Sequence, residues 1–267
     1  MVHEDLFARL NEAGYKNWLK AGYCLLKVKD GLCGYTDSEM RYFHNTLIKS
    51  NSGLQRGQRC RNDCRPRGNQ FEYACPLCNE WRREILRHHT KPGGVINWGN
   101  CRPCLWPTEH WELAKVIRSR NELMHSCEMQ VSNEWMARFQ KSLEHLLLTL
   151  QHVPEVAAAR QQIQEMLSVD LSLHIPGMDC VDGDSDMEVL IESISQCETE
   201  LLRESLKDLL SNSEVEGNPV PLERMQNVHR FLSSHRDLEE QFRTELQSLR
   251  VKETEQLKGV NTDSAKR

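Results

Sequence analysis

The stretch Ile117–Cys127, IRSRNELMHSC, guides the interpretation of the whole chain. It contains no Pro or Gly, and its central residues Glu122–Met124 favour a helix. In a helix Asn121 and His125 share one face, and the long side chain of Arg120 reaches the same region. A guanidinium binds phosphate oxygens and an imidazole exchanges protons near neutral pH, so this spacing suits chemistry on a phosphate. The alternative is an Arg and a His that only cap or solvate a helix face.

These residues resemble a known motif. Arg120-Asn121-x-x-x-His125 is similar to the Arg…His signature of HEPN domains, in which Asn or Asp often follows the Arg. The residues after the motif resemble the next helix of the DAZ-interacting-zinc-finger-protein-like HEPN group, through Ser132, Trp135, Phe139, Leu143, Leu146, Leu147 and Leu150. Residues 1–180 are similar to the vertebrate X-chromosome open reading frame 38 family, through Tyr15–Trp18, Lys20–Gly22, Glu84–His89, Trp98–Pro103, Asn121-Glu122 and Met124–Ser126.

The resemblance implies a mainly α fold, namely a HEPN-like helical bundle. In catalytic HEPN proteins two protomers cleave RNA without a metal. His125 would then assist proton transfer at the 2′-hydroxyl, Arg120 would stabilise the phosphorane, and Asn121 would orient the His or the phosphate. Other HEPN domains act as RNA-binding or dimerisation scaffolds. The family pattern also places a long stretch with another helix after Val116. Here Ile117 follows directly, so this chain resembles a shortened form.

Composition favours an intracellular protein. Of the 267 residues, 39% are hydrophobic and 27% are charged, and no apolar run approaches the roughly 20 residues of a membrane span. The N-terminal MVHEDLFARLNEAG has no apolar region typical of a secretory signal. The eleven cysteines therefore indicate thiols or metal ligands rather than disulfides. We expect a cytoplasmic and/or nuclear location, with no membrane association.

Charge divides the chain into two unlike parts. Residues 1–130 contain 20 Lys and Arg against 14 Asp and Glu, whereas the remainder contains 14 against 25. The basic part suits an anionic partner such as RNA, although a solvated surface explains the excess equally well. The acidic part is suited to protein partners that bind its helices.

Hydrophobic periodicity and helix-breaking or capping residues predict the domain organisation. A HEPN-like domain spans 1–177 and includes a Cys/Arg-rich irregular insertion at 50–79. An acidic linker at 178–186, helices at 187–256 and a disordered tail at 257–267 follow. Within the first domain, Asp30-Gly31 indicates the end of one helix, Ser132 an N-cap and Pro154 a helix start. Gly14 and Gly22 indicate either an interruption of the helix or a close approach of another helix. The C-terminal helices fit either a hairpin or an intermolecular coiled coil.

The insertion contains a candidate zinc site. Cys60-x3-Cys64 precedes Cys75-Pro-Leu-Cys78, and the second pair resembles a zinc knuckle. A segment so poor in apolar residues would gain ordering energy from a structural zinc ion. A flexible insertion with unpaired thiols is the alternative. The ligand set stays open, because Cys101 and Cys104 form another Cys-x2-Cys pair and His88 or His89 lies close in sequence.

Three functions follow from these observations. The first is a non-catalytic, RNA-associated or scaffolding protein that binds partners through its C-terminal helices. The second is a metal-independent endoribonuclease that uses Arg120 and His125 across a homodimer. The third is a zinc-stabilised adaptor in which that motif has no role. Whether the protein is an enzyme is left undecided by the sequence.

Overall fold

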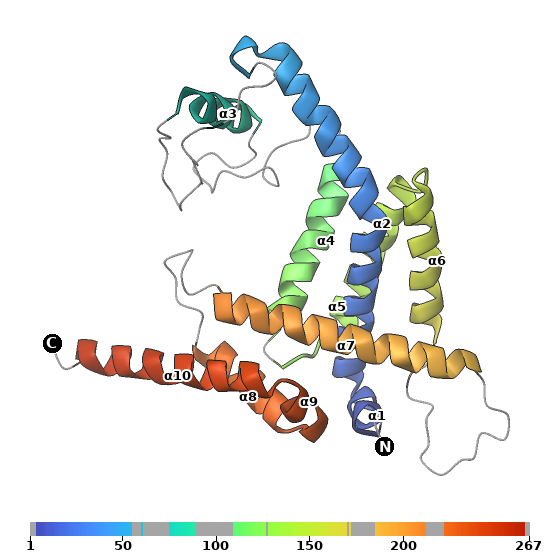
Figure 1. The fold of residues 1–267 in the computed structure, drawn as a ribbon. Coiled ribbons are helices and arrows are strands. Elements are labelled where there is room, and N and C mark those ends of the chain that lie inside the picture. The colour runs from blue at the N-terminus through green and yellow to red at the C-terminus, as the bar shows by residue number, and fades with distance from the viewer. Residues whose placement is uncertain are drawn as a thin grey trace.

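The computed structural model of the protein describes residues 4–54, 60, 75–88, 109–126, 128–169, 171, 185–211 and 222–264. Within these ranges all regular structure is helical (Figure 1), which confirms the predicted mainly α fold. No helix in these ranges is long and apolar enough to cross a membrane. Three cysteines of the predicted metal-ligand patterns, Cys64, Cys101 and Cys104, lie outside the described residues.

One long helix, α2 (Ala13–Ser50), is the spine of the molecule. Its 38 residues span about 57 Å at 1.5 Å per residue. It follows α1 (Glu4–Leu10) after a turn in which the Glu12 N–H donates to the Arg9 carbonyl. Trp18, which is fully buried, donates its indole N–H to the Leu123 carbonyl and so joins α2 to α4 (Glu109–Met124). In Figure 1 one half of α2 lies within the bundle and the other half projects toward α3 (Pro76–Arg87).

The predicted helix end at Asp30-Gly31 is wrong, because α2 continues through both residues. Gly31 is buried under α6 (Pro154–Ser168), where an added Cβ would lie 3.0 Å from the Glu155 carbonyl oxygen and 3.1 Å from the Ala159 Cβ. This glycine therefore permits close helix packing rather than a C-terminal turn. Gly22 plays the predicted role toward α7 (Ser185–Ser211), since an added Cβ would lie 2.0 Å from the nearest methyl carbon of Leu201.

Three helices pack around the inner half of α2, namely α4, α5 (Asn133–Thr149) and α6. Ser132 is the predicted N-cap of α5, and its side chain accepts a hydrogen bond from the Trp135 N–H. Pro154 is the predicted first residue of α6. Both predictions are confirmed. The first turn of a helix leaves N–H groups without a partner; Ser132 accepts from one of them, and Pro154 has no N–H to satisfy. The apolar face of α5 enters the main core through Met136, Phe139, Leu143, Leu146 and Leu147.

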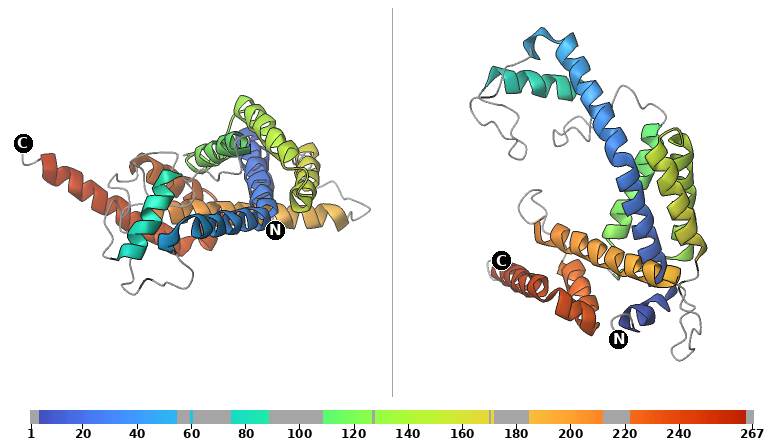
Figure 2. Two further views of the ribbon diagram at one scale, coloured as in Figure 1. Left: turned by 90° about the horizontal axis from the view of Figure 1, so that it is seen from above. Right: turned by 45° about the vertical axis from the view of Figure 1, so that its right-hand side comes forward.

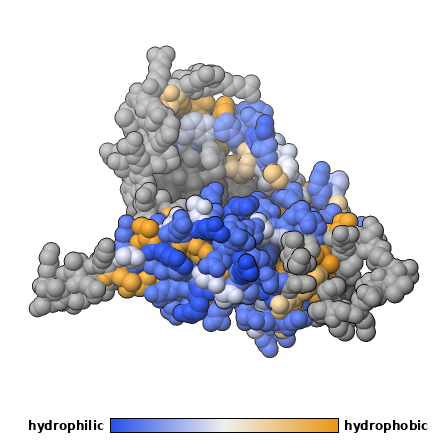
Figure 3. Space-filling view, turned by 60° about the horizontal axis from the view of Figure 1, so that its bottom comes forward, coloured by the Kyte–Doolittle hydropathy of each residue, from blue (hydrophilic) through white to orange (hydrophobic). Residues whose placement is uncertain are grey.

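The C-terminal helices share that core. Helix α7 crosses α2 in Figure 1, and α8 (Leu222–Ser233), α9 (Arg236–Gln241) and α10 (Arg243–Ser264) lie beyond it. Buried residues of α7, α8 and α10 belong to the same core as those of α2. Phe242 separates α9 from α10, and α10 continues to Ser264, past the limit of 256 that the sequence predicted for the C-terminal helices. Figure 3 shows a largely hydrophilic face, with hydrophobic side chains toward the end where α10 projects.

A second, smaller core lies at the far end of α2. Phe43 and Leu47 of α2 and Leu54 of the short 3-10 helix η1 (Ser52–Leu54) pack with Leu77 and Trp81 of α3. Figure 2 shows α3 beside this end of α2, away from the main bundle. Asn51 fixes the junction, because its side-chain amide donates to Glu80 at 2.8 Å and to Glu84 at 2.7 Å. The end of α2, η1 and α3 together are called the α3 module below.

Two glycines of α2 test the role of helix packing. We expect Gly34→Ala to raise the free energy of unfolding by roughly 0.8–1 kcal/mol, because an exposed helical Gly costs about that much relative to Ala and nothing lies within 4 Å of the added Cβ. Gly31→Ala has the same propensity gain. It must also displace the backbone of α6, and overpacking of this kind costs about 1–3 kcal/mol. Urea unfolding of both variants measures the difference, and equal stabilisation would contradict the packing argument.

Candidate functional site

The motif that guided the sequence analysis lies at the C-terminal end of α4. Arg120 donates to Glu204 of α7 at 2.5 Å, and its other terminal nitrogen lies 3.3 Å from the Asn121 side-chain oxygen. The Arg120 and Glu204 side chains are 34% and 38% exposed, so this is a half-exposed ion pair. The structure thus brings the side chains of the adjacent residues Arg120 and Asn121 into contact and places a carboxylate against the guanidinium.

His125 directly follows the last residue of α4 and is exposed. Its backbone N–H donates to the Asn121 carbonyl at 2.9 Å, which continues the helical pattern by one residue. Partial burial and the positive charge of Arg224, with a smaller effect of Arg120, lower the pKa of His125, while Asp208 opposes that shift. The imidazole is therefore held toward its neutral form, the form that accepts a proton.

Arg224 of α8 is the residue of this site that sequence reasoning missed. It is buried, and its guanidinium donates to the Met124 carbonyl at 2.7 Å, at the last residue of α4. A cation at this position satisfies a terminal carbonyl and interacts favourably with the helix dipole. No local signal could have identified the contact, since residues 124 and 224 are distant in sequence and Arg224 resembles any polar residue of an amphipathic helix.

The electrostatics of this site differ from those of a phosphate pocket. Two acidic side chains of α7, Glu204 and Asp208, act on Arg120 and His125 respectively. A phosphate that approached Arg120 would compete with the Glu204 carboxylate for the same guanidinium donors. Arg120 joins α4 to α7, and Arg224 joins α8 to the end of α4. At this site the basic first part of the chain therefore contacts its acidic second part.

A thiol cluster lies in the α3 module. The sulfur atoms of Cys60, Cys75 and Cys78 all lie within 4.8 Å of one another, and those of Cys60 and Cys75 are 3.9 Å apart. Tetrahedral thiolates at about 2.3 Å from a zinc ion would be about 3.8 Å apart. The cluster could therefore hold a metal ion. Three of the four predicted zinc ligands are brought together, and the fourth, Cys64, is outside the described residues.

The start of α3 orients two of these thiols. Cys75 immediately precedes Pro76, the first residue of the helix, and its carbonyl accepts from the Asn79 N–H at 3.1 Å. The Cys78 N–H donates to the Cys75 sulfur at 3.3 Å. His88 packs edge-on against the Phe43 ring at a centroid distance of 5.2 Å. His89 lies outside the described residues.

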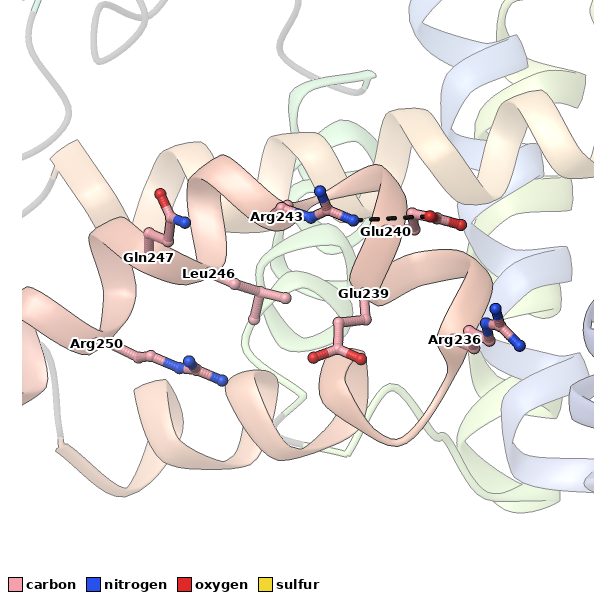
Figure 4. A pocket seen from close by; sticks show the side chains of 7 residues that line it. All are labelled: Arg236, Glu239, Glu240, Arg243, Leu246, Gln247 and Arg250. Carbon is pink, nitrogen blue, oxygen red and sulfur yellow. Dashed lines mark ion pairs between the residues drawn. The ribbon is translucent and has the colours of Figure 1, made fainter.

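A separate hollow follows one face of α9 and α10 (Figure 4) and was not anticipated from the sequence. Its lining mixes both signs of charge, through Arg236, Glu239, Glu240, Arg243, Leu246, Gln247 and Arg250. Arg243 pairs with Glu240 at 3.6 Å, and Arg250 donates to His229 at 2.9 Å. The hollow contains none of the motif residues and none of the clustered cysteines.

The surroundings of His125 make a prediction about pH. Arg224→Met removes a positive charge and should raise the pKa of His125, whereas Asp208→Asn removes a negative charge and should lower it further. The folded chain binds this proton more weakly than the unfolded chain, so the contribution of His125 to stability falls as pH drops below about 6.5. NMR titration of the His125 ring measures both shifts. A His125 pKa that is unchanged in both variants would refute the effect of the Arg224 and Asp208 charges on the ring.

Comparison with known proteins places the chain in a family. The family described as "Domain of unknown function (DUF4559)" matches residues 9–120 and 115–263. The mouse "Uncharacterized protein CXorf38 homolog" is 34% identical over 314 aligned positions, which cover 100% of this chain and 98% of the mouse protein. No solved structure matches.

The lengths and positions of these matches can be compared with the expectation that this chain lacks a stretch after Val116. The mouse alignment is longer than the 267 residues of this chain, so the relative contains residues without a counterpart here. The two parts of the family match meet at residues 115–120, around the Val116-Ile117 junction. These observations agree with a shortened member of the group. The chain belongs to the DUF4559 family and is similar along its whole length to the mouse CXorf38 homolog.

Proposed function

We propose that this protein is a non-catalytic interaction scaffold built on a HEPN-like bundle. The observation that carries the proposal is the ion pair of Arg120 with Glu204, which neutralises the guanidinium that a nuclease would direct at phosphate. Asp208 is a further acidic side chain at this site, and it raises the pKa of His125 against the net lowering that burial and Arg224 cause. A second protomer would have to displace these acidic contacts to build a paired active site.

The surfaces offered by such a scaffold are helical. Support for the HEPN-like part of the proposal comes from the position of the motif at the end of α4, with the amphipathic helix α5 following it. The acidic half of the chain supplies α7 to α10, of which α10 projects from the body. Protein partners would bind through these C-terminal helices. The intracellular location expected from the sequence would suit this role.

A nuclease assay tests the non-catalytic part of the proposal. Wild type, Arg120→Ala and His125→Ala should all leave a labelled single-stranded RNA uncut above background. Arg118→Ala is the matched control, because Arg118 is an exposed arginine of the same helix. Cleavage that is lost in Arg120→Ala and His125→Ala but kept in Arg118→Ala would overturn the proposal and support the endoribonuclease.

The same variants report on the structural role of Arg120. Loss of the Arg120–Glu204 pair should lower the free energy of unfolding by about 0.2–1 kcal/mol, the usual range for a half-exposed ion pair. Arg118→Ala should leave it unchanged. A double-mutant cycle with Glu204→Ala measures the coupling between the two side chains, and zero coupling would remove the pair from the argument.

A second proposal concerns the thiol cluster, which we assign to a structural zinc ion. Cys60, Cys75 and Cys78 supply three thiolates, and Cys64 is the fourth ligand predicted from the sequence. The α3 module has only a small core, so the metal would contribute much of the energy that orders it. The bound ion would supply no chemistry here beyond holding Cys60 against the start of α3.

Metal analysis of the purified full-length protein tests this assignment. We expect about one zinc per chain. Cys75→Ser and Cys78→Ser should each lose the zinc, and with it the stacking of His44 on Trp81 in the α3 module. Cys33→Ser is the matched control, because Cys33 is an exposed cysteine outside the cluster and should retain zinc. A folded wild-type protein free of metal would refute the zinc assignment.

A further inference from the structure

We propose that Cys60 and Cys75 are an oxidation-sensitive pair, in which Cys60 is the site that reacts with a hydroperoxide and the resulting Cys60–Cys75 disulfide releases the metal. This inference rests on the proposed zinc site and adds a means of controlling it. The α3 module would then be ordered under reducing conditions and loosened by peroxide.

The geometry places the two sulfurs within reach of bond formation. They are 3.9 Å apart, and a disulfide bond of about 2.05 Å requires an approach of about 2 Å. Cys60 lies outside any helix and is exposed, so a reagent can reach it and its backbone is not held by helical hydrogen bonds. Cys75 is buried at the start of α3, so it is the protected member of the pair.

The surroundings of Cys75 suit the second step. The Cys78 N–H donates to the Cys75 sulfur at 3.3 Å, which stabilises negative charge on that atom. The 12-residue helix α3 begins at the next residue, so the positive end of its dipole adds to this effect. These contacts place the Cys75 sulfur, with donors directed at it, beside the sulfur that it would attack.

The reaction balances with a hydroperoxide as the only oxidant. The Cys60 thiolate attacks the terminal peroxide oxygen, the O–O bond breaks, and the alkoxide takes a proton from water, which gives a sulfenic acid and an alcohol. The Cys75 thiolate then attacks the Cys60 sulfur, the S–S bond forms, and hydroxide leaves and is protonated. Two thiolates, one hydroperoxide and two protons thus give one disulfide, one alcohol and one water. The metal loses two anionic ligands and dissociates.

The described cysteines outside the cluster lack these properties. Cys24 and Cys197 are buried in the main core, and burial raises the pKa of Cys24 to about 12 and raises that of Cys197 as well. They remain protonated thiols, which react slowly. Cys33 is exposed on α2 but has no place in the cluster, so it can be oxidised without releasing a metal.

Peroxide treatment of the zinc-loaded full-length protein tests the proposal. Hydrogen peroxide should release nearly all the bound zinc, as read with a chromogenic chelator. Peptide mapping should find a Cys60–Cys75 link, with a mass lower by two hydrogens. Dithiothreitol and added zinc should restore the metal. Cys33→Ser should release zinc as wild type does, which excludes a contribution of the exposed Cys33 thiol.

Several outcomes would overturn it. These are retention of zinc under peroxide, a link between Cys75 and Cys78 in place of the predicted one, or release that occurs only with irreversible sulfinic acids. The test also separates this inference from the zinc assignment. Protein that binds no zinc before treatment refutes the assignment, whereas protein that binds zinc and keeps it under peroxide refutes only the oxidation-sensitive pair.

Discussion

A buried guanidinium joins the two ends of the chain. Arg9 of α1 lies 2.8 Å and 2.9 Å from the two carboxylate oxygens of Glu198 in α7, and 3.0 Å and 2.9 Å from those of Asp237 in α9. The Tyr15 hydroxyl donates to Glu198 and completes the cluster. Burial opposes the charge on Arg9, but both carboxylates outweigh that effect and raise its pKa, while burial raises the pKa of Glu198. An unpaired charge in this position would be strongly destabilising, so the cluster links α1, α7 and α9 in the folded protein.

Cations also join helices in a second way, in which a Lys or Arg of one helix binds backbone carbonyls at the end of a distant helix. Arg224 binds the Met124 carbonyl at the end of α4, Lys20 binds the Leu167 and Val169 carbonyls at the end of α6, and Lys252 binds the Leu210 carbonyl at the end of α7. Each contact satisfies an acceptor that a helix leaves open and favours the helix dipole. Arg120 also joins two helices, but it does so by pairing with the side-chain carboxylate of Glu204 within α7 rather than with a terminal carbonyl.

The α3 module is built differently from the main bundle. Its few apolar residues pack on the projecting end of α2, and Trp81 stacks on His44 at a centroid distance of 4.9 Å. Three thiols gather where the chain enters α3. A metal that adds binding energy there, and that leaves when the thiols are oxidised, would give this module a stability independent of the main core. A scaffold with one stable body and one conditional module can present different surfaces under different conditions.

Local chemistry in the sequence determined most of the helices. Ser132, Pro154 and the apolar spacing of α5 act within one or two turns, so the N-cap, the helix start and the buried face could all be predicted. The clustering of Cys60 with Cys75 and Cys78 also followed from thiol spacing on a short segment. Tertiary structure alone decided the rest. Gly31 has the sequence signature of a helix end, yet it continues α2 because α6 packs against it. The contacts of Arg120 with Glu204 and of Arg224 with Met124 link residues far apart in sequence, and no local pattern encodes which carboxylate or carbonyl a cation will reach.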